Sequence, residues 1–330
     1  MRSVAVANRL LYSTSRHRTG ARRVVQTVGE YLAVNSHDAN NSADIGLSAG
    51  QMATLACLLE ATAPKSGNVH RGADFEDLTF VDLATSGVAI GAAIDRLLAG
   101  DEKGRRLGRL VLAAVDAMRG ACGSNAYLGT ILLIAPLALA RDGAPLGTGV
   151  AEVLRSLTAA DARDIYEAIR RAAPGGLGKA EEHDVSGDAP SDLLVAMRAA
   201  ADRDLVARQY ANGFAEVVNE AAPLVEGVRA SGMSLSAAIV FAHVSLIARH
   251  GDSLIARKCG QETSLAAAAR AQRVLDAGAA GTEDYLTAMA DFDFWLRSDG
   301  HRRNPGTTAD IIGAALFALL REGRLPPPWR

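Results

Sequence analysis

Helix-start signals that precede apolar residues at helical spacing recur along most of the chain, and they constrain its fold more than any other feature. Ser48 and Gln51 form the pattern of a capping box, and apolar residues from Met52 to Leu59 then recur three or four positions apart. Similar starts are marked by Thr79, Thr158, Ser234, Thr263, Thr282 and Thr307. No segment alternates polar and apolar residues with the period of two that a half-buried strand requires. The sequence therefore predicts an all-α fold.

The predicted helices fill one domain, residues 46–330. They lie at about 48–60, 79–100, 106–119, 128–140, 158–173, 192–220, 235–249, 264–277, 283–297 and 308–322. The helices on both sides of the long loop 174–191 are alike, so we expect a single multi-helix, bundle-like domain. Residues 1–45 differ, because they contain six arginines and no acidic residue before Glu30. This composition is similar to that of a transit peptide, but we expect an unstructured extension or a start codon placed too far upstream.

The bulk composition argues against several classes of function. A net charge of −2 leaves no excess of positive charge with which to hold nucleic acid. The longest apolar run, 128–140, is too short to cross a bilayer and contains Pro136. Cys57, Cys122 and Cys259 are far apart and odd in number, so we expect neither a disulfide framework nor a zinc site. These features favour a cytoplasmic protein that binds small molecules, with a homo-oligomer as an open alternative.

The first group of polar residues that interrupts the helical pattern begins at Glu60. This residue continues the buried stripe of its helix at the C-terminal end, where the helix dipole disfavours an anion, so we expect a cation or a metal ion nearby. The loop that follows, APKSGNVHRG at 63–72, offers Lys65, His70 and Arg71. The alternative is that Glu60 lies in water on a frayed last turn.

The same loop has the composition of a phosphate-binding segment. Lys65 and Arg71 could hold phosphate, while Asn68 and His70 could orient an oxygen. Asp74 and two further acidic residues come next, and acidic and basic groups side by side suit Mg²⁺ bound to a polyphosphate. The loop lacks the GxxxxGK[ST] pattern of a Walker motif, so a solvated loop whose charges neutralise one another is the alternative.

Two further groups lie next to apolar helical segments. Asn125, in GSNAYLG, precedes the apolar run and either lies buried with partners or caps the helix. Asp204 and Arg208 fall on the apolar stripe of 192–220, four residues apart. That position favours a buried ion pair, retained for function, over a surface pair.

The last two groups lie in the C-terminal part of the chain. In GDSLIARKCG, Asp252 can cap a short helix whose last turn carries Arg257 and Lys258. In SDGHRRNPGTTAD, a basic loop leads into a helix start, and free backbone N–H groups beside arginines favour an anion site. Its candidate ligands are Arg302, Arg303, Asn304, Gly306, Thr307 and Thr308. Asp310 would close a capping box with Thr307 or hold a metal ion.

Five polar groups on separate helix ends can converge on one site that handles a nucleotide or a polyphosphate, and in this order they resemble a known family. The stretches LEATAPKSGNVHRGADF, GSNAYLGTILLIAPLA, AMRAAADRDLVARQY, DSLIARKCG and NPGTTADIIGAALFALL are similar to those of the triphosphoribosyl-dephospho-CoA synthase family, also called ATP:dephospho-CoA triphosphoribosyl transferase. The resemblance covers most of residues 48–322. It implies an all-α transferase of the pentosyltransferase class.

The resemblance implies transfer of a triphosphoribosyl group from ATP to 3'-dephospho-CoA with release of adenine, and Mg²⁺ is expected with ATP. Positive charge then develops at C1' of the ribose, where a carboxylate would stabilise it. The candidate catalytic residues are Glu60, Asp74, Asp204, Asp252 and His70, of which Asp252 and His70 are candidate general bases. The candidate metal ligands are Glu60, Asp74 and Asp310. The candidates for substrate binding are Lys65, Asn68, Arg71, Asn125, Arg208, Arg257, Lys258, Arg303, Asn304, Gly306, Thr307 and Thr308.

Two loops differ from the forms that are common in the family. The first reads APKSGNVH instead of TPKPGLVD, so that Ser66 replaces a proline and His70 an acidic residue. In the second, Tyr127 and Leu128 stand where the family has histidine and lysine. These forms resemble a divergent branch linked to methanopterin-dependent one-carbon metabolism, in which the acceptor is another cofactor precursor. A hydrolase of the same N-glycosidic bond and a non-enzymatic nucleotide-binding scaffold are further alternatives.

Overall fold

The computed structural model describes residues 46–141, 143–175 and 184–329, and the arginine-rich segment 1–45 lies outside these ranges. Within them the regular structure is helical, apart from one four-residue strand segment, β1 (Ser298–His301), and no β-sheet is formed. The predicted all-α fold is confirmed. No helix of the described part is long and apolar enough to cross a bilayer.

The helices follow one another along the chain with short connections. The first half contains α3 (Ala49–Thr62), α4 (Phe80–Leu98), the 3₁₀ turn η1 (Glu102–Gly104), α5 (Leu107–Cys122), α6 (Leu128–Leu139), α7 (Leu146–Arg155) and α8 (Ala159–Ala172). The second half contains α9 (Leu193–Ala200), α10 (Leu205–Asn212), the π-helical turn η2 (Val217–Ala221), α11 (Ala222–Ala230), α12 (Leu235–His250), α13 (Ser253–Cys259), α14 (Gln261–Asp276), α15 (Glu283–Arg297) and α16 (Gly306–Arg321).

Local capping chemistry explains where several helices begin. Ser48, Thr79 and Thr158 each accept a hydrogen bond from the backbone N–H three residues later, and the side chain at that later position bonds back to the cap. Ser234, Asp252 and Thr282 also cap their helices through side-chain oxygens. These bonds satisfy N–H groups that have no partner within the helix. The predicted starts at these positions are therefore confirmed.

The single long helix predicted over 192–220 is wrong. The chain leaves the helix after α9, and Asp204 (φ −138°) starts α10 as its N-cap. Gly213 and Phe214 then adopt left-handed backbone conformations before η2 begins. Asp204 breaks the helix because its carboxylate takes the N–H groups of the next turn. Phe214 is fully buried, so packing holds it in a conformation that is unfavourable for a non-glycine residue.

Two predicted helix starts are also wrong. Gly260, not Thr263, is the N-cap of α14. Pro305 precedes α16, and Thr307 lies buried in its first turn without capping it. The expected capping box between Thr307 and Asp310 is absent, because the hydroxyl of Thr130 on α6 donates to the Asp310 carboxylate instead.

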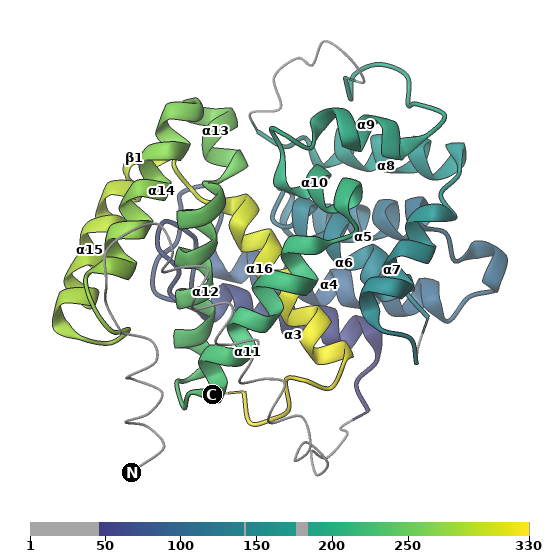
Figure 1. Cartoon of the computed structure of the whole chain (residues 1–330). Helices are drawn as coiled ribbons and strands as arrows, with labels where there is room; N and C mark the ends of the chain where they lie inside the picture. Colours follow the sequence, from purple (N-terminus) through teal and green to yellow (C-terminus); the bar gives the residue numbers. More distant parts are fainter. Residues whose placement is uncertain (1–45, 142, 176–183, 330) are drawn as a thin grey trace.

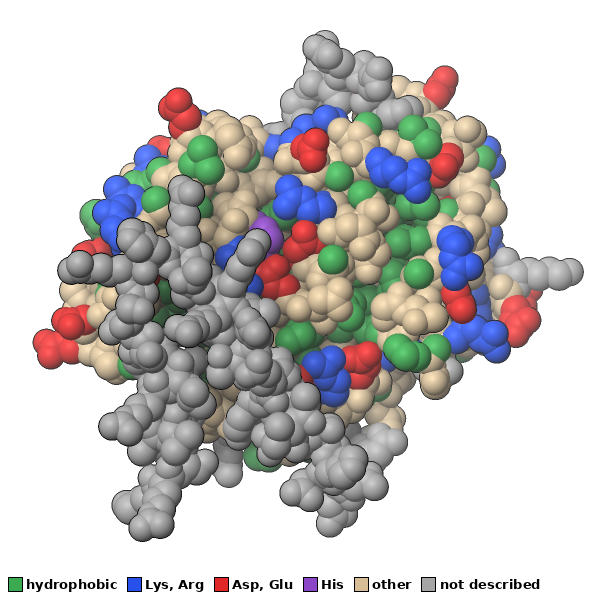
Figure 2. All heavy atoms as spheres, viewed as in Figure 1, with side chains coloured by type: hydrophobic (Ala, Val, Ile, Leu, Met, Phe, Trp, Pro, Cys, Tyr) green, Lys and Arg blue, Asp and Glu red, His purple; other side chains and the backbone are tan. Residues whose placement is uncertain are grey.

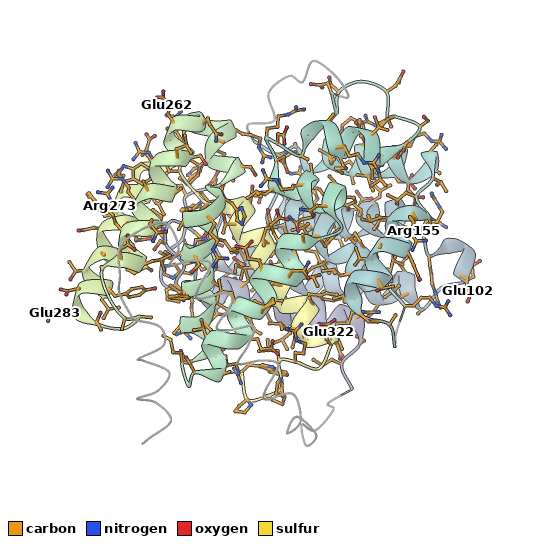
Figure 3. The ribbon with its side chains drawn as sticks, viewed as in Figure 1. Glu102, Arg155, Glu262, Arg273, Glu283 and Glu322 are labelled. Atoms are coloured by element: carbon orange, nitrogen blue, oxygen red, sulfur yellow. The ribbon has the colours of Figure 1, made fainter. Side chains whose placement is uncertain are left out.

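The helix α16 runs through the middle of the molecule, where it packs against α3, α6, η2 and α12 (Figure 1). Its buried residues belong to the main hydrophobic core. A second core is formed by α12, α13, α14 and α15, toward the left of the view (Figure 1). Its buried members are Val244, Ile247, Ile255, Ala267, Ala271, Val274, Tyr285, Phe292 and Leu296. Labelled charged side chains on α14 and α15, such as Glu262 and Glu283, point away from this layer (Figure 3).

Acidic and basic side chains are interspersed on the face shown in Figure 2, and no continuous patch of one sign covers its visible part. This distribution agrees with a net charge of −2. The visible part of that face has no continuous basic surface of the kind that binds a polyanionic nucleic acid.

The helices α3 and α4 approach each other closely at two glycines. A Cβ atom on Gly91 would lie 2.1 Å from Thr54 Oγ1 and 2.4 Å from the Gly50 carbonyl oxygen. The side chain of Thr54 also donates to the Gly87 carbonyl at 3.1 Å. This close packing fixes α3, whose C-terminal end carries Glu60, against the rest of the main core.

Candidate functional site

A pocket of about 60 Å³ opens between the C-terminal end of α3, the start of α6 and the first turns of α16. Five polar side chains form part of its lining: Glu60, Asn68, Thr130, Asn304 and Asp310. The apolar part of the lining consists of Val69, Leu78, Leu83, Ala126, Tyr127 and Ala309. The sequence-predicted groups around Glu60, Asn68, Asn304 and Gly306 therefore meet in one place.

Glu60 and Lys65 form a buried ion pair beside this pocket. Lys65 is fully buried, and its Nζ atom lies 2.8 Å from Glu60 Oε1. The ammonium group also donates to the backbone carbonyls of Glu60 and Ala63. Those carbonyls are at the C-terminal end of α3, where a cation is favourable. The structure thus supplies the cation expected near Glu60, and the alternative of a frayed turn in water is wrong, since Glu60 is only 5% exposed.

Asp310 is a second carboxylate at the pocket, and its environment differs from that of Glu60. Its Oδ1 atom accepts from Thr130 Oγ1 at 2.6 Å, and its Oδ2 atom lies so close to Gly129 that a Cβ there would be 2.1 Å away. No lysine or arginine of the described part forms an ion pair with it. Loss of hydration in the pocket, followed by the negative charges of Glu60 and Asp252, raises the pKa of Asp310 to about 7, against the lowering effect of the Thr130 hydrogen bond.

Asp252 joins the starts of two helices. Its Oδ1 atom accepts from the N–H groups of Leu254 and Ile255 at 2.8 and 3.0 Å. Its Oδ2 atom accepts from both the N–H and the hydroxyl of Thr308, each at 2.8 Å. Burial raises the pKa of Asp252 in spite of these hydrogen bonds. All four donors are held in place, so Asp252 acts here as a structural link, and its role as a general base stays a prediction.

This link also bears on the predicted phosphate site at the start of α16. The N–H and the hydroxyl of Thr308 are both occupied by Asp252. The N–H of Gly306 donates to the Asn304 carbonyl at 2.9 Å, and Thr307 is buried. The Gly306 N–H and both Thr308 donors are therefore occupied in this conformation, whereas the Asn304 side chain lines the pocket.

Asp204 is found away from the pocket lining and without its predicted partner. Its carboxylate caps α10 and forms an ion pair with Arg257 of α13. Arg208 instead donates to the Ala201 carbonyl at 3.1 Å. The predicted buried pair of Asp204 with Arg208 is therefore wrong, because the Asp204 carboxylate is taken by the first N–H groups of α10 and by Arg257.

Several other predicted residues lie outside the pocket lining. Asp74 is exposed and accepts from the Phe80 N–H at 2.7 Å, so it helps to begin α4. Arg71 is also exposed. His70 accepts from the Gly72 N–H at 3.1 Å, and burial, together with the positive charges of Arg297 and Lys65, lowers its pKa.

The remaining predicted residues also have local partners. Asn125 accepts from the Leu128 N–H at 3.0 Å, but the N-cap position of α6 belongs to Tyr127, so Asn125 does not cap the helix. The Arg303 guanidinium lies 4.6 Å from the centre of the Trp295 ring and donates to the Trp295 carbonyl at 3.0 Å. Lys258 is partly buried in the last turn of α13.

The described residues contain no group of three or more His, Cys, Asp or Glu side chains that could hold a metal ion by themselves. Mg²⁺ bound to a nucleotide needs only one or two protein carboxylates in addition to phosphate oxygens. Glu60 and Asp310 offer such oxygens at the same pocket. Asp74, the third predicted ligand, does not line it.

Sequence reasoning missed several residues that shape the site. Thr130 was hidden in an apolar run, although a single hydroxyl among LGTILLIAPLALA is a signal that could have been followed. Tyr127 is buried at the pocket, and its hydroxyl donates to the Cys57 carbonyl at 3.3 Å. Arg297 and Asp293 of α15 hold the backbone of the loop 63–72. Contacts of this kind join distant segments and leave no local pattern.

Comparison with known proteins places this geometry in context. The family model for ATP:dephospho-CoA triphosphoribosyl transferase matches residues 47–326. A crystal structure from Archaeoglobus fulgidus, of a protein provisionally named triphosphoribosyl-dephospho-CoA synthase, is similar with a TM-score of 0.56 and 25% sequence identity. That similarity covers 74% of this chain and 99% of the other. No curated protein matches the chain.

Proposed function

The chain belongs to the ATP:dephospho-CoA triphosphoribosyl transferase family, and we propose that the pocket lined by Glu60 and Asp310 is where it carries out this transfer. The reaction moves a triphosphoribosyl group from ATP to dephospho-CoA and releases adenine. The assignment rests on one observation: the carboxylates of Glu60 and Asp310 line the same pocket but have different surroundings. Different surroundings allow two such groups to take different roles.

The transfer reaction requires a negative charge near the ribose and a group that accepts a proton. When the bond from C1' to the adenine nitrogen breaks, its electron pair leaves with adenine and positive charge develops at C1'. Glu60, which Lys65 holds in place at 2.8 Å, supplies a fixed carboxylate for that charge. The acceptor hydroxyl bonds to C1' and loses its proton, while adenine gains one.

Asp310 suits the proton transfer. A carboxyl group with a pKa of about 7 is present in both protonation states at neutral pH. Thr130 orients one oxygen by a hydrogen bond of 2.6 Å, and Gly129 leaves room for the other. Asp310 would take the proton from the acceptor hydroxyl and return one to the departing adenine, so that protons balance over the cycle.

Phosphate binding and Mg²⁺ belong to the same proposal. Asn68 and Asn304 line the pocket and could orient phosphate or ribose oxygens, and Arg303 directly precedes Asn304 in the sequence. Mg²⁺, when bound with ATP, would neutralise charge on the triphosphate, with Glu60 or Asp310 as its protein ligand.

One observation favours a second acceptor. Tyr127 and Leu128 occupy the positions at which the family has histidine and lysine, and both are buried, at 4% and 8% exposure. Tyr127 therefore adds an apolar surface to the pocket where a basic pair would add positive charge. A cofactor precursor other than dephospho-CoA, with less negative charge near this wall, is the second candidate.

Adenine release tests the proposal. The purified protein is incubated with ATP and Mg²⁺, with and without dephospho-CoA, and adenine is measured by liquid chromatography. We expect adenine only when dephospho-CoA is present, and we expect Asp310→Asn to lower kcat by about 100-fold or more. Asp116→Asn, which removes an exposed carboxylate paired with Arg171, is the matched control and should keep full activity.

The other outcomes separate the alternatives. Adenine formed from ATP without any acceptor would identify a hydrolase. Tight ATP binding without adenine release, with dephospho-CoA or with other cofactor precursors, would leave a nucleotide-binding scaffold. Full activity of Asp310→Asn would contradict the assigned site while leaving the family's reaction in place.

A further inference from the structure

Two residues of α15 hold the backbone of the first loop from outside the pocket. Arg297 donates from Nη2 to the Asn68 carbonyl at 2.6 Å, and the Gly67 N–H donates to Asp293 Oδ1 at 2.7 Å. Arg297 Nε also binds both oxygens of Asp293, at 2.9 and 3.0 Å. The side-chain pair therefore holds backbone groups of two consecutive residues, Gly67 and Asn68, in a loop that is more than 220 residues away in the sequence.

The loop fits tightly against α15 at the point of this grip. Gly67 has φ +74°, a left-handed conformation that favours glycine. A Cβ atom there would lie 2.8 Å from Leu296 Cβ and 3.0 Å from Pro305 Cδ. Leu296 belongs to the second core. The backbone at Gly67 thus lies in close contact with the packed helix α15.

The residue held in this way continues into the pocket. The Asn68 side chain is 5% exposed, lines the pocket and donates from Nδ2 to Asn304 Oδ1 at 2.5 Å. Arg297 itself is not among the lining residues. Its guanidinium lies 5.9 Å from the centre of the Phe75 ring, and that ring stacks on His301 with centres 5.1 Å apart. Segments 67–75 and 301–304, which are far apart in the sequence, are therefore in contact beside the pocket.

We propose that Arg297, supported by Asp293, is a positioning residue that fixes the Asn68 side of the pocket and thereby sets the affinity for ATP. The inference rests on the proposed function, because it takes this pocket to bind the ribose of ATP. Charge-assisted hydrogen bonds from a planar guanidinium hold a peptide group in one place. Because the loop is already held in place before ATP binds, binding costs less conformational entropy in the loop.

The test compares three variants of the full-length protein. Arg297→Gln removes the charge, and Arg297→Lys keeps a charge that can reach only one of the two partners. Arg324→Gln is the matched control, because Arg324 forms a similarly half-buried pair with Glu226 at 2.5 Å, away from the loop. We expect Arg297→Gln to raise KM for ATP about tenfold with less than about threefold change in kcat, Arg297→Lys to be intermediate, and the control to be unchanged.

A second readout needs no activity. Hydrogen exchange of the peptide that covers residues 64–75 is followed by mass spectrometry without substrate. We expect exchange at least about tenfold faster in Arg297→Gln and unchanged in Arg324→Gln, since the Gly67 N–H loses an ordered acceptor. An unchanged KM for ATP in an active Arg297→Gln enzyme, or equal exchange in the two variants, would overturn the positioning role. Wild-type protein that releases no adenine would overturn the proposed function alone, because the exchange comparison still decides the role of Arg297.

Discussion

At the scale of single residues, the most unusual side chain in the described structure is His243 on α12. It is fully buried, and neither ring nitrogen makes a hydrogen bond of normal geometry. Burial, followed by the positive charge of Lys65, lowers its pKa well below the ordinary value. A backbone contact with Pro305 opposes this lowering only in part. The imidazole is therefore held neutral, and a buried polar group without a well-formed hydrogen bond costs stability.

Replacing this imidazole should stabilise the protein. We expect His243→Leu to raise the free energy of unfolding by about 1 kcal/mol at pH 7, because an apolar side chain of similar size needs no hydrogen bond. Urea unfolding followed by circular dichroism at pH 7 measures the change. A loss of stability of the same size would show that His243 has a partner that matters.

The same residue predicts a pH dependence. The folded protein holds His243 with a lowered pKa, so below the unfolded value of about 6.5 the unfolded chain binds a proton that the folded chain does not. Stability should therefore fall as pH decreases from 6.5, and His243→Leu should show a weaker fall over the same window. Urea unfolding at several pH values between 5 and 8 compares the two proteins, and identical slopes would contradict the expectation.

At the scale of helices, the contact of α3 with α4 shows how glycine permits close packing. We expect Gly91→Ala to lower the free energy of unfolding by about 3 kcal/mol, because its Cβ would lie 2.1 Å from Thr54 Oγ1. Gly120→Ala in α5 is the control, since nothing lies within 4 Å of its Cβ and alanine favours a helix interior by about 0.5–1 kcal/mol. Thermal unfolding of both variants should show shifts of opposite sign.

The helices also show what the sequence could and could not predict. Capping boxes at Ser48, Thr79 and Thr158 were found because both partners lie within four residues. A cation or a metal ion was expected near Glu60, with Lys65, His70 and Arg71 as the nearby cations, and the structure places Lys65 there, five residues away. The break at Asp204 was missed, because an apolar stripe continued through a residue whose carboxylate competes for backbone N–H groups.

Local sequence patterns could not predict the contacts of the site that join residues far apart in the sequence. Thr130 and Asp310 are 180 residues apart, and Asn68 and Asn304 are 236 apart. Asp310 was expected to bond with Thr307 on its own helix, but it accepts a hydrogen bond from the Thr130 hydroxyl on α6 instead. A single sequence states which side chains are polar; which of them meet depends on how the helices cross.

At the scale of the whole molecule, Asp252 connects the two cores. It begins α13, which contributes Ile255 to the second core, and it binds Thr308 at the start of α16 in the main core. Because it accepts from four donors at once, its loss would loosen the second core against α16. The site lies at this junction, since α15 holds the loop that lines the pocket.

We expect Asp252→Asn to lower the free energy of unfolding by about 2–4 kcal/mol, because an amide NH₂ would face backbone N–H donors and leave them unpaired. Chemical unfolding measures this change, and Asp116→Asn on the exposed end of the Arg171 pair should lose less than about 1 kcal/mol. A variant with normal stability and very low kcat would instead assign Asp252 to the chemistry as a general base.

The central position of α16 has a consequence for how the molecule is made. One carboxylate of the pocket, Glu60, is translated early, whereas Asp310 and Asn304 are translated roughly 240 residues later, as the separation of 236 between Asn68 and Asn304 indicates. The helices α3 and α6 are translated long before α16, which packs against both of them. Until then their apolar faces stay open to solvent and to chaperones. A nascent chain stopped before Gly306 would carry nine of the twelve residues that line the pocket, but it would lack Asp310, the second of its two carboxylates.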